Sequence, residues 1–263
     1  MEMIPISFED CFQTMHSEMS GIHLPVIMGK ADNGSVEVRD LSILKNILLA
    51  GAPSQGKTNF IHCMIEAIAR LRTPQQVKFI LCDPKEMEFS DMPDEYMNYL
   101  YESEKIGNRI FQSHDDITAV LELLIDEMYS RMDLLNYSNK RNLIEYNDTV
   151  QNKICDIVVI IDEIADLVTL KEYNKELIER LAMFGSMVGI HLIISTQRPS
   201  EDVISWKIQV NFPTKISFRS RNELNSIRII DSKDASELDS CGKMIVNYDN
   251  KEQMQYISPL IYW

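Results

Sequence analysis

The stretch that decides the fold reads Gly51-Ala-Pro-Ser-Gln-Gly-Lys-Thr58, and it fits the pattern G-x-x-x-x-G-K-S/T at every fixed position. An apolar run at residues 45–50 predicts a buried strand before it, and residues 59–70 predict a helix after it. A glycine-rich loop in this place lets backbone N–H groups point at phosphate oxygens, and the positive end of the helix adds to that field. The sequence therefore predicts a site for a nucleoside triphosphate.

The expected ligands of this loop are ATP and Mg²⁺. Lys57 is expected to reach the β- and γ-phosphates, and the Thr58 hydroxyl is expected to bind Mg²⁺. The residues assigned to nucleotide binding are Gly51, Ala52, Pro53, Ser54, Gln55, Gly56, Lys57, Thr58 and Asn59. Lys57 is also counted among the catalytic residues, because it would lie against the transferred phosphate.

The rest of the chain predicts an α/β fold with a mostly parallel central sheet and helices on both faces, because strands alternate with helices. The expected strands are residues 45–50, 76–82, 156–161, 191–195, 214–219 and 242–247, with helices at 115–135 and 175–187. A short extension should precede them. It comprises a helical lead-in over residues 1–22 and a hairpin from 24–29 to 35–39 that turns at Asn33-Gly34. The polar residues 138–150 are expected to form a loop.

Composition narrows the class of protein. The chain has 263 residues, of which 45% are hydrophobic, and a net charge of −14. That charge argues against a generally basic nucleic-acid binder, although a ring with an acidic outside and basic pore loops remains compatible with it. Five scattered cysteines disfavour a zinc site or a disulfide framework. We find neither an apolar run of about 20 residues nor a signal peptide, and so expect a cytoplasmic protein with no membrane span.

Two further motifs end predicted strands, at the edge where ligands bind in open α/β sheets. Asp162 and Glu163 follow strand 156–161. Asp162 is suited to bind Mg²⁺ and Glu163 to polarise the attacking water as general base. The alternative for this pair is a helix N-terminus stabilised by its dipole. Gln197, in the motif Ser195-Thr196-Gln197 at the tip of strand 191–195, can sense the γ-phosphate or hold the water.

A third motif, Asp83-Pro84-Lys85, follows strand 76–82. Its simplest interpretation is a turn that carries exposed charges.

Together these motifs resemble the motor domain of the FtsK/SpoIIIE family of double-stranded DNA translocases. The resemblance is collinear over roughly residues 24–250. The matching stretches are residues 24–30, 48–58, 73–80, 83–85, 141–147, 158–167, 189–200, 202–204 and 211–218. Its most specific part is the pair D-E-I-A-D-L and T-Q-R-P at this spacing.

The resemblance implies a RecA-like P-loop ATPase domain, a homo-hexameric ring, and hydrolysis of ATP at subunit interfaces. In such rings an arginine from the neighbouring subunit stabilises charge on the transferring phosphate. The candidates are Arg219, Arg221 and Arg228, each with a solvated surface arginine as its alternative. The family often has Ser-Arg before Ile-Leu-Asp, whereas here Ile227 separates Ser226 from the arginine. Ser186 stands where the family tends to carry another arginine.

We therefore expect residues 24–263 to be a motor domain, after a lead-in over 1–23, that hydrolyses ATP and moves double-stranded DNA through sequence-independent phosphate contacts. Lys85, Arg70 and Arg72 are candidates for contacting DNA, with solvated surface faces as the favoured alternative. The membrane helices, linker and winged helix of the family's chromosome motors are not visible in the sequence. A motor core without them suits a mobile-element or conjugation-type ATPase recruited to the inner face of the membrane by a membrane-anchored partner. The alternatives are a type VII secretion-like ATPase that exports polypeptide and a nucleotide-gated scaffold.

Overall fold

The structure is a computed structural model, and it describes the whole chain except residues 1–5, 16–17, 20, 103–109, 170–171 and 263. Within the described ranges, ten strands form one sheet in the order β2-β1-β10-β9-β8-β3-β7-β6-β4-β5. The strands are β1 Pro25–Ala31, β2 Val36–Asp40, β3 Ile47–Ala50, β4 Val77–Cys82, β5 Ile110–Phe111, β6 Asp156–Ile161, β7 Ile190–Thr196, β8 Thr214–Phe218, β9 Lys243–Tyr248 and β10 Glu252–Ile257.

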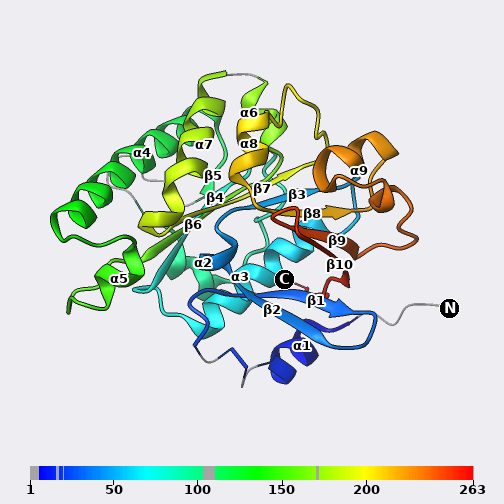
Figure 1. The fold of residues 1–263 in the computed structure, drawn as a ribbon, viewed down its shortest axis with the longest axis horizontal. Coiled ribbons are helices and arrows are strands. Elements are labelled where there is room, and N and C mark those ends of the chain that lie inside the picture. The colour runs from blue at the N-terminus through cyan, green and yellow to red at the C-terminus, as the bar shows by residue number, and fades with distance from the viewer. Residues whose placement is uncertain (1–5, 16–17, 20, 103–109, 170–171, 263) are drawn as a thin grey trace.

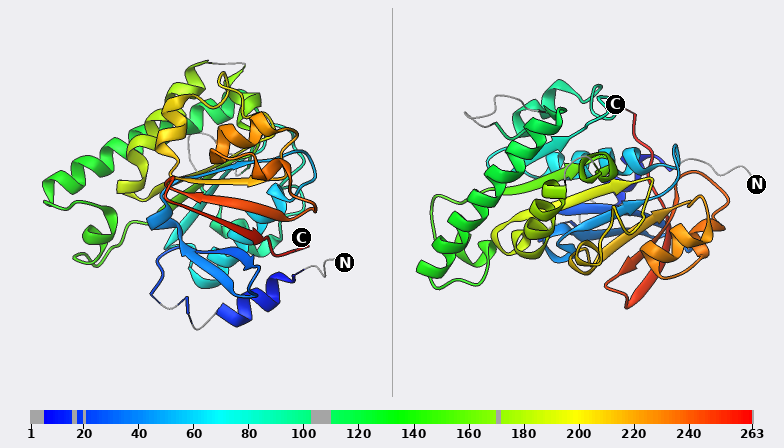
Figure 2. Two further views of the ribbon diagram at one scale, coloured as in Figure 1. Left: turned by 45° about the vertical axis from the view of Figure 1, so that its right-hand side comes forward. Right: turned by 90° about the horizontal axis from the view of Figure 1, so that it is seen from above.

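The helices lie on both faces of this sheet (Figures 1 and 2). They are α1 Phe8–Met15, α2 Leu41–Leu44, α3 Lys57–Leu71, α4 His114–Tyr137, α5 Leu143–Asn147, α6 Ile164–Val168, α7 Glu172–Phe184, α8 Trp206–Asn211 and α9 Glu223–Ile230. Short 3₁₀ segments occupy Asp94–Tyr99, Gly185–Val188 and Asp234–Ser236. The described helices include none that combines the length and the apolar character needed to cross a bilayer.

The sheet has a parallel part and an antiparallel part. Strands β8, β3, β7, β6, β4 and β5, in that order, pair with one another in parallel. Strands β9, β10, β1 and β2 continue the sheet from β8 in antiparallel pairs. The predicted α/β class, the mostly parallel sheet and the N-terminal helix and hairpin are confirmed, and strand β10 is an element that the sequence pattern did not indicate.

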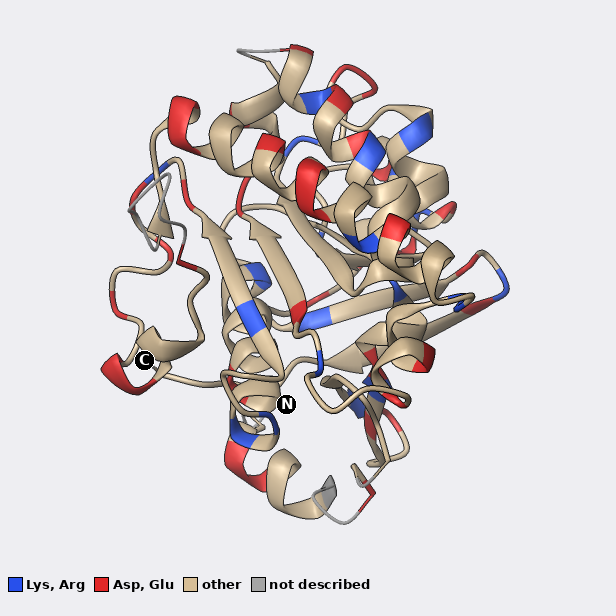
Figure 3. Ribbon diagram, turned by 90° about the vertical axis from the view of Figure 1, so that its left-hand side faces the viewer, with Lys and Arg blue, Asp and Glu red and all other residues tan. Residues whose placement is uncertain are grey.

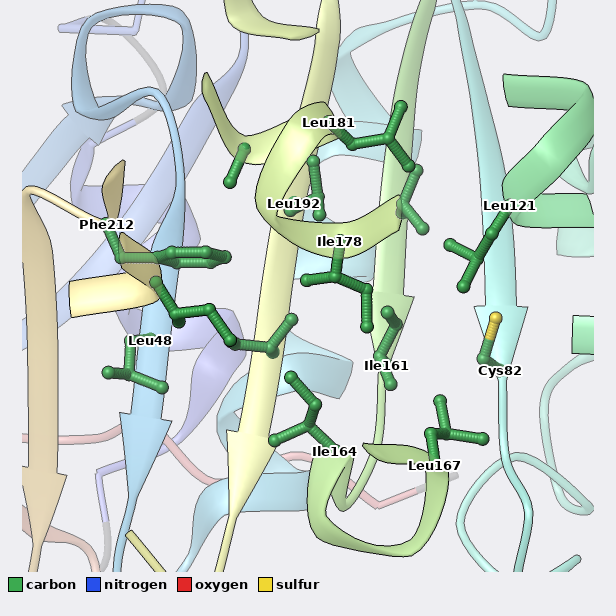
Figure 4. Close-up of a cluster of buried hydrophobic side chains, with 14 of the residues drawn as sticks. Leu48, Cys82, Leu121, Ile161, Ile164, Leu167, Ile178, Leu181, Leu192 and Phe212 are labelled. Carbon is green, nitrogen blue, oxygen red and sulfur yellow. The ribbon is translucent and has the colours of Figure 1, made fainter. Parts of the chain in front are cut away.

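Strand β6 shows how one apolar run serves both layers of the core. Ile157, Val159 and Ile161 pack with α4, α6 and α7, while Val158 and Ile160 face α3 on the other side. Successive side chains of a strand point to opposite faces, so a continuous apolar run is what a strand covered on both faces requires. In Figure 4, Ile178 and Leu181 of α7 lie over Ile161 of β6 and Leu192 of β7.

Among the described residues of the predicted lead-in, helix α1 covers Phe8–Met15. Residues 1–5, 16–17 and 20 of that prediction lie outside the described part. Phe8, Cys11 and Phe12 pack in a small core with Ile27 of β1 and Cys63 of α3. This extension therefore rests on the helix that follows the glycine-rich loop.

The predicted loop at residues 138–150 is wrong in part, because it contains helix α5. The Asn142 side chain accepts a hydrogen bond from the Glu145 backbone N–H at 2.9 Å and caps the N-terminus of this helix. Asparagine is a strong N-cap residue, so a polar, Asn-rich composition does not by itself exclude a short helix.

Candidate nucleotide-hydrolysis site

Residues 51–56 form the turn that joins β3 to α3, and its two glycines are required by close contacts with β8. Gly51 has φ +155°, and a Cβ there would lie 2.8 Å from the Phe218 Cβ. Gly56 has φ +111°, and a Cβ would lie 3.2 Å from the Phe218 ring. Since side chains avoid this backbone region, both positions favour glycine. The loop is also held to the sheet, because the Ala52 N–H donates to the Arg219 carbonyl at 2.8 Å.

Lys57 is the first residue of α3, and its ammonium group lies inside the loop. The Nζ atom donates to the carbonyl oxygens of Gly51 at 2.9 Å and Ala52 at 3.0 Å. Burial lowers the pKa of Lys57 from its ordinary value, while the carboxylates of Asp162 and Glu163 act in the opposite direction. The loop thus holds a desolvated cation at the position where phosphate oxygens are expected to bind.

Asp162 follows β6, and its side chain is held by the neighbouring strand β7. Its Oδ1 atom accepts a hydrogen bond from the Ser195 Oγ of β7 at 2.7 Å. Burial raises the pKa of Asp162 to about 6, and the Ser195 hydrogen bond opposes this only partly. A buried carboxylate with this environment is stabilised by a cation, because a positive charge favours its ionised form.

Glu163 connects β6 to the tip of β7. Its Oε1 atom accepts from the Thr196 hydroxyl at 2.8 Å, and its Oε2 atom accepts from the Gln197 N–H at 2.9 Å. The backbone is left-handed, with φ +49°, which costs a non-glycine residue about 1–3 kcal/mol and is common at functional sites. Glu163 is the N-cap residue of α6, but its side chain makes no capping hydrogen bond to that helix and binds the end of β7 instead.

Lys57 and Asp162 border a cavity of about 620 Å³, within the range typical of small-molecule sites. Of the residues assigned to nucleotide, metal or catalysis, it is lined by Pro53, Ser54, Gly56, Lys57, Thr58, Asn59, Asp162 and Gln197. Gly51, Ala52, Gln55 and Glu163 are not among the described residues that line it. Glu163 instead lines a neighbouring cavity of about 360 Å³ together with Gln197.

The donor set suits a magnesium ion. The hydroxyl of Thr58 and the carboxylate of Asp162 line the same cavity, and both are hard oxygen ligands of the kind Mg²⁺ prefers. Mg²⁺ bound beside the buried Asp162 carboxyl would offset the cost of desolvation that raises its pKa.

The far wall of the larger cavity was not indicated by the sequence. It consists of Ile6, Met87, Glu88, Cys241, Gly242 and residues 257–260. Asn59 holds this wall in place, because its Nδ2 donates to the Pro259 carbonyl at 2.5 Å and its Oδ1 accepts from the Ile261 N–H at 3.0 Å. Asn59, which the sequence assigned to nucleotide binding, therefore lines the cavity, while its polar atoms bind the C-terminal segment.

The three arginine candidates are all exposed. Arg221 lines the smaller cavity beside Glu163, whereas Arg228 lies on α9 and Arg219 directly follows β8. Along the ribbon, Lys and Arg are interspersed with Asp and Glu in the view of Figure 3.

The other two arginines considered for DNA contact have internal partners. Arg70 forms ion pairs with Glu9 and Glu66, both at 2.6 Å. The Arg72 Nε donates to the His23 carbonyl at 2.6 Å. Both side chains therefore tie the N-terminal segment to α3 and its C-terminus.

The sequence profile of the FtsK/SpoIIIE family matches residues 9–201, which include the glycine-rich loop, Asp162, Glu163 and Gln197. The chain belongs to the FtsK/SpoIIIE family. Two proteins named "DNA translocase FtsK" are similar to it. The one from Chlorobaculum tepidum is 32% identical over 246 residues, and the one from Chlamydia pneumoniae is 31% identical over 258 residues. Each match covers 92% of this chain, which spans about a third of either relative (30% and 31%).

Solved structures agree with this FtsK/SpoIIIE assignment at the level of the fold. The cytoplasmic domain of the type VII secretion ATPase EccC from Thermomonospora curvata superposes with a TM-score of 0.77 at 21% identity, over 91% of this chain and 29% of that one. The monomer of the pCW3 conjugation coupling protein TcpA with ATPγS superposes with a TM-score of 0.76 at 24% identity, over 90% and 66%. The expected RecA-like ATPase fold is confirmed.

Proposed function

We propose that this FtsK/SpoIIIE chain hydrolyses ATP in the cavity beside residues 51–58. The observation that carries the proposal is that Lys57, Asp162, Glu163 and Gln197 meet at the carboxyl edge of β3, β6 and β7. Three strand ends thus supply a phosphate-binding cation, a metal-binding carboxylate, a base and an amide, which is the set that phosphoryl transfer to water needs.

Each side chain has a distinct role in this proposal. Lys57 exchanges the loop carbonyls for phosphate oxygens. Thr58 and Asp162 hold Mg²⁺, which neutralises charge on the phosphates when it is bound. Glu163 accepts a proton from the attacking water, and the Gln197 amide orients that water or the γ-phosphate.

We further propose that hydrolysis drives the translocation of double-stranded DNA. This rests on the identity of about 30% to proteins named DNA translocase across most of the chain. In this proposal the chain forms a homo-hexamer in the cytoplasm and an exposed arginine, Arg219, Arg221 or Arg228, completes the site of its neighbour. A membrane-anchored partner recruits the ring to the inner face of the membrane, for DNA transfer of the mobile-element or conjugation type or for DNA segregation.

Steady-state ATP hydrolysis at low salt, with and without long linear double-stranded DNA, tests this function. We expect strong stimulation that fades as salt rises, because phosphate contacts release counterions. Lys57→Ala is the control and should neither bind ATP nor hydrolyse it. Basal turnover that DNA does not change would contradict the DNA motor and favour the polypeptide-exporting alternative. ATP binding without turnover under either condition would favour the scaffold.

A further inference from the structure

Lys85 lies on the wall between the two cavities of the site. Together with Gln197, it lines both the larger cavity, where the nucleotide is proposed to bind, and the smaller one that contains Glu163. A side chain in this position can reach a ligand on one side and the proposed general base on the other. The D-P-K motif that carries it therefore has a place in the site beyond that of a surface turn.

The backbone that carries Lys85 is fixed by a buried carboxylate. The Asp83 Oδ1 atom accepts from the Lys85 N–H at 3.2 Å, and Oδ2 accepts from the Glu88 N–H at 2.8 Å. Asp83 itself is held to the sheet, because its N–H donates to the Phe111 carbonyl of β5 at 2.9 Å. These bonds set the path of the loop beside the cavity, while the Lys85 side chain stays 37% exposed.

The ammonium group of Lys85 contacts two carboxylates on the side away from the larger cavity. Its Nζ atom is 3.3 Å from the Asp166 Oδ2 and 3.9 Å from the Glu163 Oε2. The side chain of Asp166 is 40% exposed. The pair with Asp166 is open to water and therefore weak, so the cation can leave it at little cost when a more highly charged partner enters the larger cavity. Glu163 is buried, with a side chain that is 5% exposed, but its distance to Lys85 is long and it keeps its hydrogen bonds to Thr196 and Gln197 when the cation leaves.

We propose that Lys85 is a second phosphate-binding lysine, which leaves Asp166 and Glu163 for the γ-phosphate of bound ATP. This inference rests on the proposed function. A terminal phosphate concentrates negative charge on three oxygens, whereas ADP lacks that group. The exchange therefore depends on ATP, and it removes the cation from Glu163 only when a phosphate is present to be cleaved.

Through Lys85, the binding of ATP is coupled to the position of the general base Glu163. Before ATP binds, Glu163 is held by Thr196, by the backbone of Gln197 and by the nearby Lys85. Departure of Lys85 removes one of these attractions. The carboxylate is then freer to turn toward a water in line with the γ-phosphate, the geometry that proton abstraction requires.

Lys85→Met tests this inference, because methionine keeps the length of the side chain without its charge. We expect the affinity for Mg·AMP-PNP to fall by about 10- to 100-fold, the value of a charge-assisted hydrogen bond. The affinity for Mg·ADP should stay within about threefold of the parent, since Lys85 is assigned to the γ-phosphate alone. ATP turnover should fall, and Lys85→Arg should restore part of both losses.

Two further variants sharpen the result. Lys78→Met is the matched control, because Lys78 lies on the preceding strand β4 and donates to the Asn98 carbonyl, away from both cavities. It should leave the affinities for both nucleotides unchanged. Asp166→Asn removes the competing carboxylate, so it should raise the preference for AMP-PNP over ADP by a few fold.

Equal affinities of Lys85→Met and the parent for AMP-PNP would overturn the inference. So would a loss of AMP-PNP and ADP binding to the same extent, which would mean that Lys85 only supports the loop. Lys57→Ala separates this from a failure of the proposed function. If Lys57→Ala binds neither nucleotide while Lys85→Met is unchanged, the site stands and only the role of Lys85 is wrong; if Lys57→Ala binds both, the site and the inference fall together.

Discussion

Two buried aspartates, one at each end of strand β6, differ in their surroundings. Asp156 is the first residue of β6 and is 3% exposed, and Asp162 directly follows that strand and is 6% exposed. Asp156 has two histidine partners, with the His23 Nε2 at 2.7 Å and the His191 Nε2 at 3.8 Å. Asp162 has the Ser195 hydroxyl and faces a cavity.

Their pKa values diverge accordingly. Burial acts to raise the pKa of Asp156, but the interactions with His191 and His23 outweigh it and hold that pKa below its ordinary value. Burial prevails at Asp162 and raises its pKa to about 6. A buried carboxylate with hydrogen-bonding partners that favour its ionised form contributes to stability, whereas one left facing a cavity costs stability and can bind a cation. We infer that Asp156 is structural and that Asp162 belongs to the site.

The largest expected difference between the two aspartates is in activity. Asp162→Asn should lower ATP turnover about a thousandfold, equivalent to about 4 kcal/mol in the barrier, because a Mg²⁺ ligand is lost. Asp156→Asn should stay within about threefold of the parent at a temperature where both variants are folded. Steady-state hydrolysis measures both. Parental turnover in Asp162→Asn would break the comparison.

The second difference is in stability, and it has the opposite sign. A rise in the pKa of Asp162 from 3.8 to about 6 corresponds to a cost of roughly 3 kcal/mol at pH 7. Asp162→Asn should therefore raise the free energy of unfolding by about 1–3 kcal/mol, while Asp156→Asn should lower it by a similar amount through lost hydrogen bonds. Urea unfolding at pH 7 without nucleotide or Mg²⁺ tests this, and a destabilised Asp162→Asn would contradict it.

The smallest effects lie in the pH dependence of stability. The pKa of Asp162 is higher in the folded state than in the unfolded state. The contribution of Asp162 to the free energy of unfolding is therefore greatest below about pH 4 and declines as pH rises to about 6. The pKa of His23 is raised chiefly by its hydrogen bond to Asp156, so this stabilisation is full below about pH 6.5 and declines as pH rises through the raised value.

Urea unfolding as a function of pH separates these two windows. Asp162→Asn should flatten the decline between about pH 4 and 6, and Asp156→Asn should flatten the decline above about pH 6.5. The lowered pKa of Asp156 adds a loss of stability on the acid side, as pH falls through its folded value. Curves in which either variant flattens the other window would show that the assignments are exchanged.

The sequence was informative where chemistry follows directly on a strand. Asp162 and Gln197 follow an apolar run within two residues and Lys57 follows one by seven, and parallel strands bring their carboxyl ends to one edge. A local pattern therefore predicts a shared location without knowledge of the sheet order. The two core layers follow for the same reason, since a continuous apolar run such as β6 predicts a strand covered on both faces.

What the sequence did not predict depends on contacts between distant segments. The wall at residues 257–260 belongs to the site because Ser7 pairs with Leu260 and Asn59 binds Pro259. Asp156 is structural because of His23, which lies 133 positions away in the sequence. The sequence predicts only that Lys85 lies in a turn, whereas the structure shows that it lies beside Glu163. These contacts join residues that are far apart in the sequence, so no periodic pattern in a single sequence indicates them.

The most direct test of the central claim is ATP binding and single-turnover hydrolysis by Glu163→Gln. Glutamine keeps the shape of the side chain and cannot accept the proton of the attacking water. We predict that Mg·ATP binds within about threefold of the parental affinity and that the hydrolysis rate falls by about 10²- to 10⁴-fold. Hydrolysis at the parental rate would contradict the account, because the base would then have to lie elsewhere than at the end of β6.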